Sequence, residues 1–409
     1  MLTNPCHRVH RLKNPIQHYA WGSKRAIADL TGRGTPSRRP EAELWMGAHP
    51  KAPSMVLCDD DEVALNHFIT RCPEEILGPA VIQRFGAELP FLFKILAADA
   101  PLSIQAHPNR EQARRGYARE NREGVPLDAP QRNYRDDNHK PEVLCALTDF
   151  WGVNGFRPLP DLQQMLNSYC PESLGKIFAS LQNASPPRAL RHLFHHMMSL
   201  QGQDLTRTVD EALAFVQAPQ EDCDETVSHW LEALSEAYPG DIGILAPLIL
   251  NLIHLKPGQA IYLPAGQLHA YLEGVGVELM ANSDNVLRGG LTPKHIDREE
   301  LLAVLRFEPT PSAIVDVQPV SATATWFRTP AEEFSLARIH LSHDTPHMSM
   351  PHHNVEILFV TQGQLMLSLD NGGQRMPLSR GDSVLVPAAA GSYHLSGTAE
   401  IYQATVPQP

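Results

Sequence analysis

One short segment, residues 257–271 (PGQAIYLPAGQLHAY), limits the possible folds of this chain more than any other. Its order is Gly258, five residues, Pro264, one residue, Gly266, two residues and His269. Pro and Gly favour tight turns, so the segment predicts a β-hairpin corner that holds the His269 imidazole at a fixed point. A histidine presented in this way indicates a chain built around a sheet, with a site at the turn.

Two other segments supply metal-ligand side chains. LSIQAHPN (102–109) contains Gln105 and His107, and NHKPEVL (138–144) contains Glu142. Residues i and i+2 of a strand share a face, so Gln105 and His107 can point at the same ion. With His269 the segments offer two imidazoles, one carboxylate and one amide oxygen. This donor set predicts a metal site, with zinc as the first expectation and one ion per chain.

Composition excludes several classes of protein. The net charge is −12 with no long basic run, which argues against nucleic acid as a partner. No apolar run approaches the roughly 20 residues that span a bilayer, so we expect no membrane association. The N-terminus lacks an apolar core and a cleavage site, and the six cysteines form no C-x-x-C pair. These features predict a cytoplasmic protein with reduced cysteines.

The chain changes character twice. Strand-like segments bounded by Pro, Gly or Asp precede residue 157, and apolar residues recur at helical spacing from there to about 240. Strand patterns return at about 251, and a polar connector from 307 leads to an alternating tail. We therefore predict a mainly β protein with an α-helical insertion. The spacing of the 257–271 segment resembles a metal-binding motif of the cupins, and this resemblance implies two jelly-roll β-barrels plus a helical domain. The expected domains are a catalytic zinc-binding barrel (1–156 and 250–320), the helical insertion (157–249) and a C-terminal jelly roll (321–409).

Longer blocks of the sequence resemble type I phosphomannose isomerases, members of the cupin superfamily. The blocks occur in the family's order and span roughly residues 19 to 297: YAWGSK (19–24), AELWMGAHP (42–50), LPFLFKILAADAPLSIQAHPN (89–109), HKPE (139–142), LPAGQLHAYL (263–272) and ELMANSDNVLRGGLTPK (278–294). Long matches in the correct order are more specific than a single motif. The resemblance implies a zinc-dependent interconversion of mannose 6-phosphate and fructose 6-phosphate, and a monomer. It also implies the ligands Gln105, His107, Glu142 and His269.

An aldose–ketose isomerisation needs a proton shuttle between C1 and C2, and a cation to stabilise the enediolate that develops. The resemblance places Lys140, Glu278 and Asp284 among the participants, and we assign proton transfer to this group with Glu278 as the first choice. Arg288 offers a planar fork that suits either the enediolate or the phosphate, and both roles stay open.

The remaining substrate contacts are expected away from the metal. The resemblance places Ser103 and Lys294 at the phosphate. Trp21 offers an aromatic face that could stack on the sugar, although packing in the core explains it equally well.

Two other functions are compatible with the same donors. A cupin oxygenase would hold iron there, and a non-catalytic cupin would bind a hexose phosphate without converting it. Gln105 disfavours the first, and the intact set of polar candidates argues against the second. His352, Glu356 and His394 in the tail imitate a metal triad with broken spacing, and we interpret them as a structural remnant.

Overall fold

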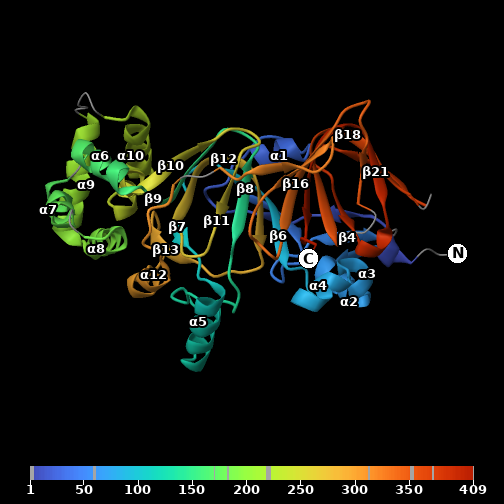
Figure 1. Cartoon of the computed structure of the whole chain (residues 1–409), viewed down its shortest axis with the longest axis horizontal. Coiled ribbons are helices and arrows are strands. Elements are labelled where there is room, and N and C mark those ends of the chain that lie inside the picture. The colour runs from blue at the N-terminus through green and yellow to red at the C-terminus, as the bar shows by residue number, and fades with distance from the viewer. Residues whose placement is uncertain are drawn as a thin grey trace.

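The computed structural model describes residues 4–58, 61–169, 171–181, 184–217, 223–311, 314–350, 354–370 and 373–408. A helical block, a first β-sheet and a second β-sheet stand in a row, with the helical block at one end (Figure 1). This arrangement agrees with the predicted mainly β fold that carries a helical insertion.

The first sheet contains ten strands. They are β2 (Ile16–Gln17), β3 (Glu43–Gly47), β6 (Phe91–Ala98), β7 (Ile104–Ala106), β8 (Glu142–Ala146), β9 (Phe150–Phe156), β10 (Leu250–Leu255), β11 (Ala260–Leu263), β12 (His269–Ala281) and β13 (Leu287–Gly290). Its main path runs β10-β9-β12-β6-β3-β2, and β8 with β11 and β7 with β13 branch from β12. The hydrogen-bonded path between these described strands does not close into a ring, so the predicted barrel is an open, jelly-roll-like sheet.

Strand β12 connects the two halves of this sheet. Its first residues pair with β7 and β9, and the residues from Gly274 onward pair with β6 and β8. Gly274 has a φ of 125°, which other residues rarely adopt, and a β carbon there would lie 2.7 Å from the carbonyl oxygen of Asp149. A bent strand of this kind places His269 and Glu278 in different halves of one sheet.

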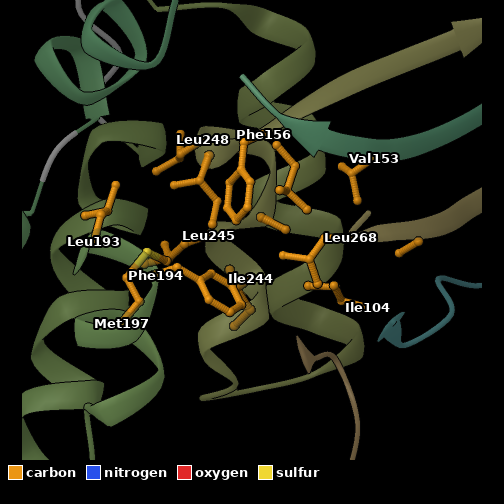
Figure 2. Packing of buried hydrophobic residues seen from close by; sticks show 14 of the residues in the cluster. Ile104, Val153, Phe156, Leu193, Phe194, Met197, Ile244, Leu245, Leu248 and Leu268 are labelled. Atoms are coloured by element: carbon orange, nitrogen blue, oxygen red, sulfur yellow. The ribbon is translucent and has the colours of Figure 1, made fainter. Parts of the chain in front are cut away.

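The helical block leaves the sheet after β9 and returns at β10. It contains α6 (Leu159–Tyr169), α7 (Glu172–Leu181), α8 (Pro186–Ser199), α9 (Gly202–Gln217), α10 (Glu225–Ala237), η2 (Ile242–Leu245) and α11 (Ala246–Ile249). Figure 2 shows that Phe194 and Met197 of this block pack toward Phe156 and Ile104 of the sheet. The insertion is therefore fixed to the first sheet by a continuous apolar core.

The second sheet contains eleven strands, and three of them come from the N-terminal part of the chain. The N-terminal strands are β1 (His10–Lys13), β4 (Met55–Cys58) and β5 (Asp61–Ala64). The others are β14 (Val317–Pro319), β15 (Ala324–Phe327), β16 (Ser335–Leu341), β17 (His347–Met348), β18 (Glu356–Leu369), β19 (Arg375–Ser379), β20 (Ser383–Val386) and β21 (Tyr393–Thr405). The path β14-β15-β16-β21-β18-β20-β1-β4-β5 is also open. No local pattern in the chain indicated that β1 would pair with β20.

The remaining helices cover the ends of the sheets. They are η1 (Pro5–His7), α1 (Ala26–Leu30), α2 (Leu65–Arg71), α3 (Pro73–Leu77), α4 (Pro79–Phe85), α5 (Arg110–Arg122), α12 (Arg298–Val304) and η3 (Ala388–Ala390). Helix α5 projects from the edge below β7 and β8 (Figure 1). Its start is fixed by a capping box in which Asn109 and Gln112 satisfy each other's backbone N–H groups.

One apolar core joins the two sheets. Phe91, Phe93 and Val143 of the first sheet share a buried cluster with Phe359 and Tyr402 of the second. Helices α2 to α4 contribute to the same cluster. The sheets therefore bury a common interface.

The structure bears on two sequence expectations, one on the cysteines and one on membrane-spanning helices. Cys6 and Cys72 are paired as a disulfide, which corrects the expectation of reduced cysteines. The spacing of the cysteines in the sequence could not reveal this pair, because η1 and α3 lie side by side only in the folded chain. Cys145 and Cys223 form no disulfide with a described residue, Cys58 Sγ lies 3.8 Å from His10 Nδ1, and Cys170 lies outside the described residues. Among the described residues no helix is long and apolar enough to cross a membrane.

Candidate metal centre

The His107, Glu142 and His269 side chains converge on one buried point. Their ligand atoms all lie within 4.8 Å of one another. His107 Nε2 is 3.6 Å from Glu142 Oε1, and His269 Nε2 is 3.4 Å from Glu142 Oε2. The three donors come from the end of β7, the start of β8 and the start of β12, so segments on both sides of the helical block meet here.

The unsatisfied polar atoms of this cluster fit a cation. His107 Nε2 and Glu142 Oε2 are buried and have no hydrogen-bond partner among the described residues. A buried polar atom without a partner is costly unless a ligand or an ion satisfies it. Nitrogen and carboxylate donors match the preferences of a borderline metal such as zinc. These residues therefore fit the group that the sequence predicted.

The orientation of both imidazoles is fixed by backbone carbonyls. His107 Nδ1 lies 2.7 Å from the carbonyl oxygen of Asn285, and His269 Nδ1 lies 3.1 Å from that of Gln267. When each Nδ1–H donates to its carbonyl, each Nε2 presents a lone pair to the cluster. Burial lowers the pKa of His107 to about 4, which keeps this imidazole neutral at physiological pH.

Gln105 lies beside these donors, as predicted. Its backbone pairs with His269 in the β7–β12 ladder, and its amide Nε2 is 3.3 Å from His269 Nε2. A half-turn of the amide would present the oxygen instead, because the two ends have the same shape. The structure therefore brings all four predicted donors together.

Two predicted proton-transfer residues lie close to this cluster. Lys140 is buried, and its Nζ is 3.3 Å from Glu142 Oε1. Asp284 forms ion pairs at its Oδ2 with Lys51 at 2.7 Å and His49 at 3.6 Å. Although burial raises the pKa of Asp284, the hydrogen bond from Lys51 and the nearby positive charges lower it overall.

Glu278, the third of these residues, lies in a buried network. Its two carboxylate oxygens accept hydrogen bonds from Tyr271 Oη at 2.7 Å and Lys94 Nζ at 2.9 Å. Lys94 also lies 3.6 Å from Glu43. Burial, aided by the charges of Glu142 and Glu43, raises the pKa of Glu278 despite Lys94.

Lys94 and Tyr271 were not identified from the sequence, although a signal was present. Lys94 is the one charged residue in the otherwise apolar segment FLFKILAA of β6. A lysine in a buried strand requires a carboxylate partner. Tyr271 follows His269 by two residues on β12 and therefore shares its face.

The residues predicted to contact substrate lie on strands of the first sheet and on the loops next to them. Arg288 pairs with Gln105 in the β7–β13 ladder, and Ser103 directly precedes β7. Lys294 is exposed on the loop after β13, and the pKa of its ammonium is lowered by partial burial and by the charges of Arg288 and Arg135. Trp21 stacks with Tyr19 at a centroid distance of 5.6 Å and packs against the apolar core.

The tail residues that imitate a metal triad in the sequence, His352, Glu356 and His394, form no metal site where the structure describes them. Glu356 accepts a hydrogen bond from Tyr393 at 2.6 Å, and His394 pairs with Asp370 at 2.8 Å. His352 lies outside the described residues. Of the described His, Cys, Asp and Glu side chains, the grouping around Glu142 is the one that could hold a metal ion.

An open jelly-roll sheet with histidine and carboxylate donors inside defines a metal-binding cupin. Comparison with known proteins narrows this class. Residues 9–159 match the model of the type I phosphomannose isomerase catalytic domain, and residues 162–250 match the model of its helical insertion domain. Residues 323–406 match the mannose-6-phosphate isomerase cupin domain.

Relatives match over nearly the whole chain. The mannose-6-phosphate isomerase of Salmonella typhimurium is 41% identical over 396 residues, which are 96% of this chain and 98% of the relative. The Homo sapiens mannose-6-phosphate isomerase is 33% identical and covers 93% of this chain and 94% of its own length. A solved zinc-bound mannose 6-phosphate isomerase has a TM-score of 0.90, 38% identity and coverage of 98% of this chain and 100% of that structure. The chain belongs to the type I phosphomannose isomerase family.

Proposed function

We propose that this chain is a zinc-dependent isomerase that interconverts mannose 6-phosphate and fructose 6-phosphate. The observation that carries the proposal is the buried donor set around Glu142, two atoms of which have no hydrogen-bond partner among the described residues. Relatives that match nearly the whole chain are named mannose-6-phosphate isomerase, and one similar solved structure is zinc-bound. Gln105, His107, Glu142 and His269 would hold one zinc ion.

The reaction moves one proton from C2 of the aldose to C1 and a second proton from the oxygen on C2 to the oxygen on C1. Bound zinc would supply Lewis-acid stabilisation of the negative charge that develops on these oxygens. The protein must supply groups that accept and return both protons.

The candidate groups differ in their surroundings. Burial raises the pKa of Glu278, which is the direction that a carboxyl acting as both proton acceptor and donor requires, so we assign it the transfer between C1 and C2. Tyr271 and Lys94 hold its carboxylate in a fixed orientation. The Lys140 ammonium next to Glu142 is placed to hydrogen-bond a sugar oxygen. Asp284, held by Lys51 and His49, would orient the substrate at the rim.

The phosphate and the sugar require contacts outside the donor set. Burial and the charge of Arg135 lower the pKa of Arg288, and burial with the charges of Arg288 and Arg135 lowers the pKa of Lys294. A phosphate dianion between these cations would relieve their repulsion. We assign Ser103 and Lys294 to the phosphate and Arg288 to the charge that develops during the reaction. Trp21 would contact the sugar.

The wider organisation follows from the same proposal. We propose a catalytic domain of residues 1–156 and 250–320, a helical insertion of residues 157–249 and a C-terminal jelly roll of residues 321–409. We further propose that the enzyme is a cytoplasmic monomer whose partner is its small-molecule substrate. Relatives named as isomerases do not favour the oxygenase or the non-catalytic alternative.

A coupled assay with mannose 6-phosphate on metal-defined enzyme tests the proposal. Removal of metal by a chelator should abolish turnover, and one equivalent of zinc should restore it. Full turnover by rigorously metal-free protein would refute the metal role. Oxygen uptake with iron would support the oxygenase, and binding without turnover would support the non-catalytic cupin.

A further inference from the structure

A carboxylate from the C-terminal part of the chain reaches the segments that carry the metal donors. Glu333 precedes β16 and is 2% exposed. Its Oε1 forms an ion pair with Arg110 Nη2 and lies 2.6 Å from His139 Nε2. Arg110 Nη2 is also 3.0 Å from His139 Nε2. The three side chains form one compact cluster, the Glu333 cluster.

Both partners of Glu333 belong to donor-bearing segments. Arg110 is the first residue of α5 and follows His107 by three residues. His139 directly precedes Lys140, whose Nζ contacts Glu142. Glu333 therefore links the segment after one metal donor to the segment before another.

The position of Glu333 is fixed by its neighbours in sequence. Ala331 and Phe334 are buried in the apolar core that the two sheets share. Glu332, between Ala331 and Glu333, is exposed instead. Because the backbone on both sides is anchored, the Glu333 carboxylate has little freedom to follow Arg110 or His139 if they move.

The cluster also borders open space next to the site. Glu333, Arg110 and Asn138 line a cavity of about 650 Å³ together with Asp284 and His49. Both contacts of Glu333 fall on Oε1, and its buried Oε2 has no hydrogen-bond partner among the described residues. The Arg110 and His139 contacts are therefore what ties this carboxylate to the donor-bearing segments.

We propose that Glu333 is a positioning residue of the isomerase. Through it, the second sheet holds His139 and Lys140 in a fixed position relative to the metal donors. This inference rests on the proposed function. Residues that orient the immediate partners of a metal site affect turnover and metal affinity without touching the metal. Glu333→Gln removes the buried charge and leaves only the partly exposed Arg110 and His139, which water can solvate, so the main effect of this substitution falls on geometry.

The test compares Glu333→Gln with Glu332→Gln in the full-length chain. Glu332 is a matched control because it is adjacent and exposed. For Glu333→Gln we expect kcat to fall about 10-fold to 100-fold and the zinc Kd to rise about 3-fold to 10-fold. Zinc affinity is measured by competition with a chromophoric chelator, and urea unfolding of each variant verifies folding. Glu332→Gln should match the unsubstituted chain in both readouts.

A second comparison separates positioning from general stability. If Glu333 acts through His139, the double variant Glu333→Gln/His139→Gln should have the kcat of the slower single variant. Losses that multiply in the double variant would overturn the proposal, as would unchanged kcat and zinc Kd in Glu333→Gln. Should Glu333→Gln fail to fold, His139→Gln alone decides, and an unchanged kcat there overturns the proposal.

The assay also distinguishes this inference from the proposed function. If the unsubstituted zinc-loaded chain does not convert mannose 6-phosphate, the proposed function fails. The zinc Kd of Glu333→Gln against that of Glu332→Gln then still shows whether Glu333 positions the donor segments.

Discussion

Removing a metal donor and removing a substrate contact should have different consequences. His269 presents Nε2 to the donor set, whereas Arg288 lies beside Gln105 on the neighbouring strand. We expect His269→Ala to lose bound zinc, and Arg288→Ala to retain zinc while kcat falls about 100-fold. Metal analysis of purified protein and steady-state kinetics measure the two effects. Unchanged kinetics in Arg288→Ala would remove that residue from the mechanism.

The buried Lys94 should contribute strongly to stability through its two carboxylate partners. Lys94→Met leaves Glu278 and Glu43 without their common cation, so we expect a loss of about 3 to 5 kcal/mol in the free energy of unfolding. Urea denaturation measures it. The exposed pair of Lys13 with Glu62 gives a control, since Lys13→Met should cost at most about 1 kcal/mol.

A second variant shows whether the unpaired charge causes the loss. Lys94→Met/Glu278→Gln removes one stranded carboxylate and should recover part of the stability lost in Lys94→Met. If the double variant is less stable than Lys94→Met, the loss arises from packing and not from charge.

At the scale of single elements, α5 is fixed by a close contact. A β carbon at Gly116 would lie 2.3 Å from the ring of Tyr134, whose hydroxyl donates to Glu300 at 2.6 Å. In an exposed helix Gly→Ala would stabilise by about 1 kcal/mol. Here we expect Gly116→Ala to destabilise by about 1 to 3 kcal/mol, because the held ring cannot yield. Thermal unfolding measures the sign, and a stabilised variant would contradict the contact.

Strand β17 should make the second sheet sensitive to acid. Burial lowers the pKa of His347 to about 4, and its Nδ1 lies 2.8 Å from Thr323 Oγ1. The unfolded chain takes up a proton near pH 6.5, whereas the folded chain does so near pH 4. Stability from His347 is therefore complete above pH 6.5 and falls as pH decreases toward 4.

Substitution of His347 isolates its contribution to the pH dependence of the free energy of unfolding. Between pH 7 and 5, the free energy of unfolding should fall more for the unsubstituted chain than for His347→Gln, by about 1 to 2 kcal/mol. Urea denaturation of both chains at both pH values measures the free energy of unfolding. Parallel pH profiles would show that His347 titrates alike in the folded and unfolded chains.

The candidate site could be predicted from the sequence only where its residues lie in short local segments. Gln105, His107, Glu142 and His269 lie in short segments where spacing and turn residues carry the information, so their convergence was predictable. Lys94 and Tyr271 required knowledge of which strands pair, since Glu278 meets Lys94 only across the β6–β12 ladder. The Glu333 cluster was beyond sequence reasoning, because its partners are separated by about two hundred residues.

At the scale of the whole molecule, the two sheets depend on each other. The N-terminal strand β1 pairs with β20, at residues separated by more than three hundred and fifty positions in the chain. Local patterns predict strands but not such distant partners, so the sequence predicted two barrels and assigned all of residues 1–156 to the first. The shared core of Phe91, Phe93, Phe359 and Tyr402 indicates a single cooperative unit instead.

A fragment of residues 1–320 tests this dependence. It retains all four donors but loses Phe359, Tyr402 and the strand β20 that pairs with β1. The exposed core of the first sheet and the missing Glu333 should prevent cooperative folding. We therefore expect no sharp urea transition and less than one equivalent of bound zinc, whereas the full chain shows both. A fragment that unfolds in one sharp transition and binds zinc fully would show that the first sheet and its donors are stable alone.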